Sequence, residues 1–203
     1  GLAGAFNSNL LTAALSFFEE KAGQARVRLI LVGKKAVTFF RKHPFPVDLA
    51  YGERTQNLTR EELRDIAQFL IRLYVFSKVD AIYVAYNEFK SILSPRLTIT
   101  KLLPLEAPEK DKNQVTLPPD WEPGARALLD RLLPLLVEVQ IQHFFFESMA
   151  AEHAARMMAM DNATRNAEEL ISDLILFLNK IRQASITKEL LEIMTAVEAL
   201  AQK

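Results

Sequence analysis

Cysteine is absent from this chain of 203 residues. Without a thiol the chain can form no disulfide, no thiolate zinc site and no cysteine nucleophile. A surplus of charge of one sign is absent too, because 25 Lys and Arg residues balance 25 Asp and Glu residues. No overall electric field therefore draws the protein toward nucleic acid or anionic lipid, and we expect no nucleic-acid partner.

Long hydrophobic runs are also missing. Apolar stretches such as 144–146 and 174–178 fall far short of the roughly 18 residues that a membrane-spanning helix requires. We therefore expect no segment that spans a membrane directly, and any association with a membrane has to be indirect.

The fingerprints of cofactor and catalytic sites are equally scarce. Neither G-x-G-x-x-G nor G-x-x-x-x-G-K-[ST] occurs, so no loop is recognisable as a phosphate cradle. His43, His143 and His153 are the only histidines, and the last two lie too far apart on a helix to share a metal ion. Glu189 and Glu192 have no histidine or nucleophile near them in sequence, which favours a surface role over acid and base catalysis. We expect no cofactor, no metal site and no catalytic residue.

Helical periodicity alternates with short apolar strands in the first half of the chain. Thr59 and Glu62 have the spacing of a capping box, which predicts the start of one of these helices. The alternation predicts an α/β fold, with a Rossmann-like, layered and mostly parallel sheet and helices on its faces. The expected helices are 9–22, 34–42 and 59–77, and the expected strands are 27–32, 47–51, 81–86 and 97–103.

Residues 104–121 are polar and rich in proline, which predicts a linker at the end of the α/β domain. We therefore divide the chain into an α/β domain at 1–121 and one long helix at 122–203. No glycine follows Gly124 and no proline follows Pro134. A continuous helix over 135–203 would be on the order of 100 Å long, so it cannot fold back on the α/β domain throughout.

Apolar residues recur along this helix at alternating steps of three and four, which is the pattern of a coiled-coil seam. The seam consists of Leu170, Leu174, Phe177 and Ile181. It predicts a second helix alongside. The three consecutive rings 144–146 cover most of the helix circumference, so we expect at least one of them to pack on the α/β domain.

Three stretches of the last helix, 152–156, 161–167 and 182–189, strongly resemble the C-terminal helix of the gamma subunit of F-type ATP synthases. The opening residues 1–7 resemble the segment that follows the first strand of that family's α/β domain. The resemblance implies that the family's N-terminal helix and first strand precede Gly1.

This resemblance implies a central rotor stalk that couples proton-driven rotation to ATP synthesis and hydrolysis in a ring of α and β subunits, without catalysing a reaction itself. The implied partners are the α, β and epsilon subunits and the membrane c-ring. The implied location is the cytoplasmic face of the bacterial inner membrane, as a peripheral membrane protein.

The resemblance also assigns residues that bind partners. Arg182 and Gln183 match positions that meet a loop of a β subunit, and the pair Glu152 and Arg156 matches positions that face another β loop. The family's terminal signature is matched by Thr187, Glu189 and Glu192. The sequence departs from that signature at Ala196 and Val197, which favour a straighter and bulkier helix tip than Gly-Ala.

Two other interpretations share parts of this pattern. One is an unrelated coiled-coil adaptor with an α/β head, which would not need the residues 182–189. The other is a small flavodoxin-like enzyme with a helical tail, which would bind a ligand at the carboxyl ends of its strands. In the gamma-subunit interpretation, the isolated chain exposes the stripe from Leu170 to Ile181, which predicts that it self-associates.

Overall fold

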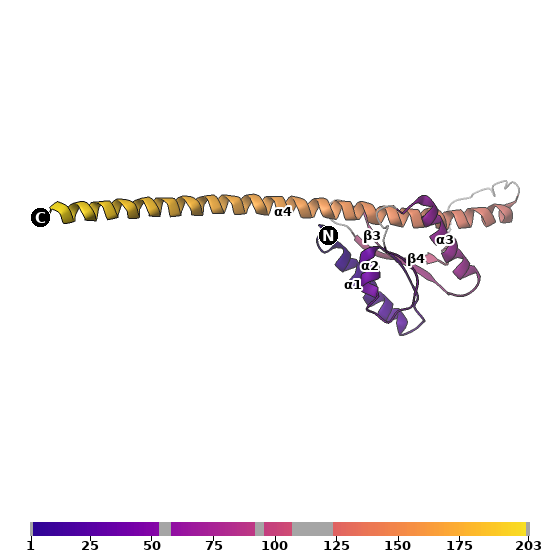
Figure 1. Ribbon diagram of the computed structural model, residues 1–203. Coiled ribbons are helices and arrows are strands. Elements are labelled where there is room, and N and C mark those ends of the chain that lie inside the picture. Colours follow the sequence, from indigo (N-terminus) through magenta and orange to yellow (C-terminus); the bar gives the residue numbers. More distant parts are fainter. Residues whose placement is uncertain (1, 53–57, 92–95, 107–123, 202–203) are drawn as a thin grey trace, which may run out of the picture. The chain divides into compact units, whose positions relative to one another are not determined.

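The computed structural model describes residues 2–52, 58–91, 96–106 and 124–201. They form two compact units, 1–158 and 159–203, and the helix α4 contributes to both. Figure 1 shows the elements along the chain. In order they are α1 (Phe6–Ala22), β1 (Leu29–Val32), α2 (Lys34–Phe40), β2 (Val47–Tyr51), α3 (Arg60–Val75), β3 (Ile82–Glu88), β4 (Arg96–Leu103) and α4 (Ala125–Ala201).

The strands of the first unit form two pairs. β1 and β2 are parallel, and the helix α2 connects them. β3 and β4 are antiparallel, with Tyr86 opposite Thr98. The α/β class with a long C-terminal helix is thus confirmed, and the second pair adds an antiparallel hairpin to the mostly parallel arrangement that was expected. The physical reason is the short connection between β3 and β4, which cannot accommodate the crossover that parallel strands need.

Local sequence signals position most of these elements. The capping box of α3 is present, since the Glu62 backbone N–H donates to Thr59 Oγ1 at 3.2 Å and the Thr59 N–H donates to Glu62 Oε2 at 2.8 Å. β2 coincides with the predicted strand at 47–51, and α1 begins three residues earlier than predicted. The predicted turn at Ser94 and Pro95 lies outside the described residues.

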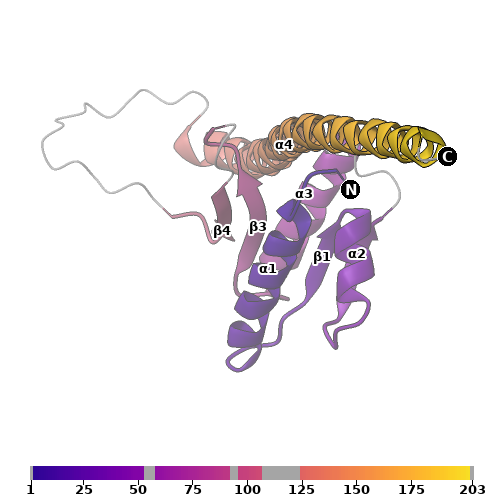
Figure 2. The same ribbon diagram turned by 90° about the vertical axis from the view of Figure 1, so that its left-hand side faces the viewer.

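Two clusters of buried apolar side chains stabilise the first unit. One lies between α1, α2 and β1 and includes Leu31 and Phe40. The other joins α3, β4 and α4, and its members Leu63 and Leu102 are almost completely buried. Figure 2 shows β3 and β4 on one side of α1 and β1 on the other. Because Val137 and Ile141 belong to the second cluster, the first part of α4 is an integral part of this unit's core.

The helix α4 is 77 residues long and begins at Ala125, so it includes Pro134. The sequence analysis predicted one long helix at 122–203, so Pro134 lies inside the predicted helix as well. Proline removes one backbone hydrogen bond and clashes with the preceding turn, so packing of the neighbouring turns on the core has to offset the cost. The linker expected at 104–121 and the division between 121 and 122 fall largely on 107–123, outside the described residues. The compact units divide between Met158 and Ala159, within α4.

Candidate functional site

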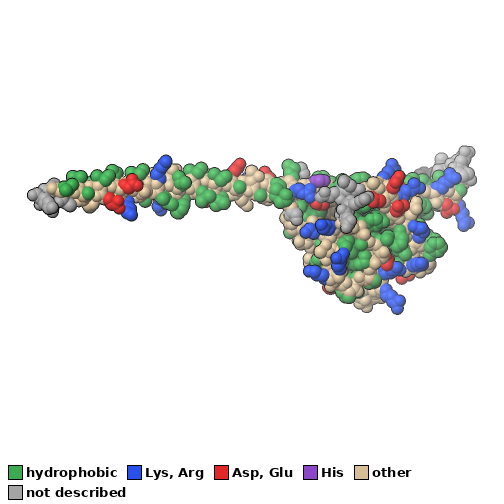
Figure 3. Space-filling model, viewed as in Figure 1, with side chains coloured by type: hydrophobic (Ala, Val, Ile, Leu, Met, Phe, Trp, Pro, Cys, Tyr) green, Lys and Arg blue, Asp and Glu red, His purple; other side chains and the backbone are tan. Residues whose placement is uncertain are grey.

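The second unit consists of the last part of α4, and it buries almost nothing. Every described side chain from Met160 to Glu198 is exposed. Hydrophobic side chains, green in Figure 3, follow this part of the helix along its whole length. Since such side chains stabilise a fold only when they leave water, this segment is built to be covered by something else.

The predicted seam accounts for one apolar face of this segment. The exposed fractions of Leu170, Leu174, Phe177 and Ile181 are 59%, 55%, 61% and 53%. Complete burial of a side chain of this size is favourable by roughly 1.5–3 kcal/mol. A second helix packed along the seam would therefore gain several such contributions.

A second apolar face runs along the end of the helix, and the sequence analysis missed it. Ile186, Leu190, Ile193 and Val197 also follow steps of four and three, and their exposed fractions are 50%, 57%, 60% and 59%. At 100° per residue this face is rotated by about 160° from the seam. The steps of four and three are visible in the sequence. These residues do not continue the series that defines the seam, however, so they were not recognised as a second apolar face.

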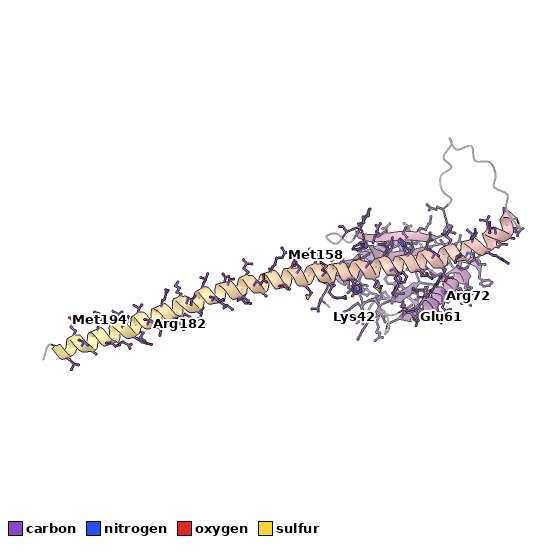
Figure 4. The ribbon with its side chains drawn as sticks, turned by 90° about the horizontal axis from the view of Figure 1, so that it is seen from above. Lys42, Glu61, Arg72, Met158, Arg182 and Met194 are labelled. Atoms are coloured by element: carbon purple, nitrogen blue, oxygen red, sulfur yellow. The ribbon has the colours of Figure 1, made fainter. Side chains whose placement is uncertain are left out.

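Polar residues predicted to bind partners lie between and beside these faces. Figure 4 shows Arg182 and Met194 projecting from the helix. Arg182 has no hydrogen-bond or ion-pair partner within the described part of the chain. Since it has no such partner there, the guanidinium of Arg182 is available for a carboxylate or carbonyl of another protein. The Thr187 hydroxyl donates to the Gln183 carbonyl at 2.8 Å, so the Thr187 hydroxyl oxygen remains able to accept a hydrogen bond.

The two acidic residues of the terminal signature make only weak contacts. Glu189 Oε1 accepts from the Ser185 hydroxyl at 3.4 Å, and Glu192 Oε1 lies 3.8 Å from Lys188 Nζ. Exposed pairs of this kind contribute little to stability. Both carboxylates are accessible to a partner, and among the described residues no histidine contacts either of them.

Glu152 and Arg156 lie in the first unit and are joined to each other. Arg156 Nη2 donates to Glu152 Oε1 at 2.5 Å, and Arg156 Nη1 lies 3.2 Å from His153 Nδ1. Both side chains are about one-third exposed. The pair therefore presents a preformed polar surface on α4, in a different unit from Arg182 and Gln183.

The described residues offer little for catalysis or cofactor binding. No group of three or more His, Asp or Glu side chains in these ranges could hold a metal ion. A hollow of about 630 Å³ lies beside Arg26, Arg28 and Phe45. These residues precede β1 and β2, so the hollow is at the amino ends of the parallel strands, whereas ligands of α/β enzymes bind at the carboxyl ends. None of the helices within the described ranges contains a stretch long and apolar enough to cross a bilayer.

Comparisons of the sequence with a family model and with individual proteins indicate the same family. The family model described as ATP synthase matches residues 1–200. The ATP synthase gamma chain of Solibacter usitatus is 42% identical over 202 residues, which is 98% of this chain and 68% of that protein. The gamma chain of Chlorobaculum tepidum is 39% identical over 206 residues, which is 100% of this chain and 70% of that protein.

Solved structures agree in fold. The central stalk and c-ring structure of the Tetrahymena thermophila mitochondrial ATP synthase contains a chain with a TM-score of 0.60 and 23% identity, over 81% of this chain and 71% of that one. A chain of the Euglena gracilis mitochondrial ATP synthase has a TM-score of 0.63 and 18% identity, over 98% of this chain and 69% of that one. Since the family model and the relatives cover almost every residue, this chain belongs to the ATP synthase gamma chain family.

Proposed function

We propose that this chain works as the central rotor stalk of an ATP synthase, coupling proton-driven rotation to ATP synthesis and hydrolysis. The observation that carries the proposal is the exposure of every described side chain from Met160 to Glu198 on one unbroken helix. A helix with apolar residues on two faces gains stability only inside a surrounding protein assembly. A stiff helix can also turn as a unit, which a jointed segment cannot.

The chain itself contributes no bond chemistry in this proposal. Its partner-binding residues are Arg182, Gln183, Thr187, Glu189 and Glu192 on the last part of the helix. Glu152 and Arg156 form a further contact on the earlier part. The α and β subunits are the proposed partners of these side chains. Charged groups on a turning helix favour one conformation of a partner over another, so rotation shifts the populations of the catalytic sites.

The seam has a different role from the polar residues. We propose that Leu170, Leu174, Phe177 and Ile181 pack against the N-terminal helix that the family resemblance places before Gly1. The α/β region is the proposed contact for the epsilon subunit and the c-ring. In that arrangement the protein is a peripheral membrane protein at the cytoplasmic face of a bacterial inner membrane.

Assembly with purified α and β subunits tests the proposal. A gamma chain of the relatives' length that carries this sequence should form a complex with α and β subunits that hydrolyses ATP. A probe attached to the α/β region should rotate during hydrolysis. Leu176→Pro should abolish rotation of the probe, because a proline inside a helix costs about 3 kcal/mol and kinks it.

Leu176→Ala is the matched control, because alanine keeps the helix while removing the same exposed side chain. It should rotate like the parent. Failure of the parent chain to bind α and β subunits would reject the stalk and favour the unrelated adaptor. Rotation that survives Leu176→Pro would show that a continuous helix is not needed.

A further inference from the structure

Apolar packing holds the first part of α4 on the α/β region, the part of the first unit that precedes this helix. Val137 and Ile141 are buried in the second core cluster, and Phe144 and Phe145 pack against it. Such packing is favourable but has no preferred direction. Apolar contacts therefore fix the rotational setting of a helix less sharply than directional polar contacts do. A stalk under torque needs contacts that resist rolling.

The packed residues Val137, Ile141, Phe144 and Phe145 form an apolar stripe along α4. Two carboxylates lie on the opposite borders of this stripe. Glu138 and Glu147 are nine positions apart, which places them about 180° apart around the helix. Taking Val137 as the middle of the stripe, Glu138 is displaced to one side by about 100° and Glu147 to the other by about 80°. Each carboxylate reaches a different element of the α/β region.

Glu147 makes the stronger of the two contacts. Its Oε2 accepts the backbone N–H of Phe89 at 2.7 Å, directly after the end of β3. Its Oε1 lies 4.0 Å from His143 Nε2 on the same helix, and its side chain is 25% exposed. A charge-assisted hydrogen bond of this length is directional and stronger than a neutral one.

Glu138 makes the weaker contact on the other border. Its Oε2 lies 3.7 Å from Arg64 Nε of α3, and its Oε1 accepts from Gln142 Nε2 at 3.3 Å. The Glu138 side chain is 17% exposed, whereas that of Arg64 is 61% exposed. The ion pair thus joins a largely buried carboxylate on α4 to an exposed guanidinium on α3.

We propose that Glu147 and Glu138 are positioning residues that fix the rotational setting of α4 on the α/β region and so carry torque between them. This inference rests on the proposed stalk function. Rolling in one sense stretches the contact from Glu147 to Phe89, and rolling in the other stretches the contact from Glu138 to Arg64. Two contacts on opposite borders therefore resist both senses of rotation.

Paired measurements in a membrane-bound ATP synthase test this role. ATP hydrolysis and ATP-driven proton pumping are measured on the same membranes, together with the melting temperature of the purified gamma chain. Glu147→Ala removes the acceptor for the Phe89 N–H, so less proton pumping per ATP hydrolysed is expected, with hydrolysis retained. Glu147→Gln keeps a carbonyl oxygen for that N–H and should restore most of the pumping.

Asp130→Ala is the control, because Asp130 is exposed on the same helix and has no partner within the described residues. It should pump like the parent. If Glu147→Ala fails to fold, Arg64→Ala carries the test, since an exposed arginine can be truncated without damage to the core. It should lower pumping per ATP hydrolysed by a smaller amount.

The inference is overturned if the truncated variants pump as well as the parent, or if Glu147→Gln loses as much pumping as Glu147→Ala at an equal melting temperature. A parent chain that neither assembles nor pumps would instead reject the stalk function. That outcome is distinguishable, because it appears before any substitution is made.

Discussion

The rings of Tyr86 and Phe144 lie with their centroids 4.6 Å apart, which joins the strand β3 directly to the helix α4. Phe145 also packs against the core cluster, whereas Phe146 is 52% exposed. The three consecutive phenylalanines thus divide between the α/β region and the surface, which confirms that at least one ring packs on that region. This contact sits beside Glu147 and helps to seat α4.

The core of the first unit should be sensitive to loss of volume in α3. Leu63→Ala is expected to lower the free energy of unfolding by about 2–5 kcal/mol, because the side chain is only 2% exposed. Chemical denaturation followed by circular dichroism measures the change. Val75→Ala in the same helix is the control, since Val75 is 66% exposed and should change stability by less than about 0.5 kcal/mol. Equal effects of the two substitutions would contradict the assigned core.

Tyr86 should ionise at a higher pH than an ordinary tyrosine. Burial raises its pKa above 10.0, and the nearby carboxylates of Glu88 and Glu147 raise it further. Because the folded state holds this proton more tightly than the unfolded chain, the stabilisation is complete below pH 10.0 and is lost as the pH rises through the folded pKa. Ultraviolet difference titration of the parent against Tyr86→Phe isolates this phenol.

The same titration reports on Glu147. In Glu147→Gln the negative charge is gone, so the Tyr86 pKa should fall toward its ordinary value while still staying above it. A Tyr86 phenol that titrates below pH 10.0 in the folded parent would contradict the described environment.

Arg182 should matter for coupling and not for folding. Arg182→Ala removes an exposed guanidinium that has no partner within the described ranges, so the melting temperature should stay unchanged. In the assembled enzyme the coupling between rotation and ATP turnover should weaken, because a charged contact with a partner is lost, and both ATP hydrolysis and proton pumping should fall. Lys180→Ala is the control, since it removes one exposed positive charge from nearly the opposite side of the helix. Normal activity with Arg182→Ala would remove Arg182 from the proposed partner-binding set.

The isolated chain should self-associate through its seam. Leu174→Glu places a charge in the middle of the seam and should shift the chain toward monomer in sedimentation velocity. Leu176→Glu introduces the same charge at a similarly exposed leucine that lies off the seam, and it should leave the association intact. A parent chain that is monomeric at high concentration would argue against an uncovered seam.

Much of the fold could be predicted because its signals are local. The capping box of Thr59 and Glu62 and the alternating steps of the seam both involve residues within a few positions of one another. Such spacings determine which segments become helices and which faces are apolar. The resemblance to the gamma chain family rests instead on the residues of 1–7, 152–156, 161–167 and 182–189.

The pairing of the strands could not be read in the same way. An apolar run predicts a strand but not its neighbour, so the antiparallel pairing of β3 with β4 was not assigned, although the short connection between them favours it. The predicted helix at 122–203 already contained Pro134, but whether its turns stay continuous there depends on how well the surrounding turns are packed.

The sequence by itself determined a long, unbroken helix with an apolar seam and exposed charged residues, since helical periodicity depends only on neighbours three and four positions away. Only the tertiary structure decided which face of that helix the α/β region covers and which groups hold it there. Phe89 and Glu147 are 58 positions apart, and no local rule connects them. Their hydrogen bond exists because the packing of all the intervening elements brings one backbone N–H to one carboxylate.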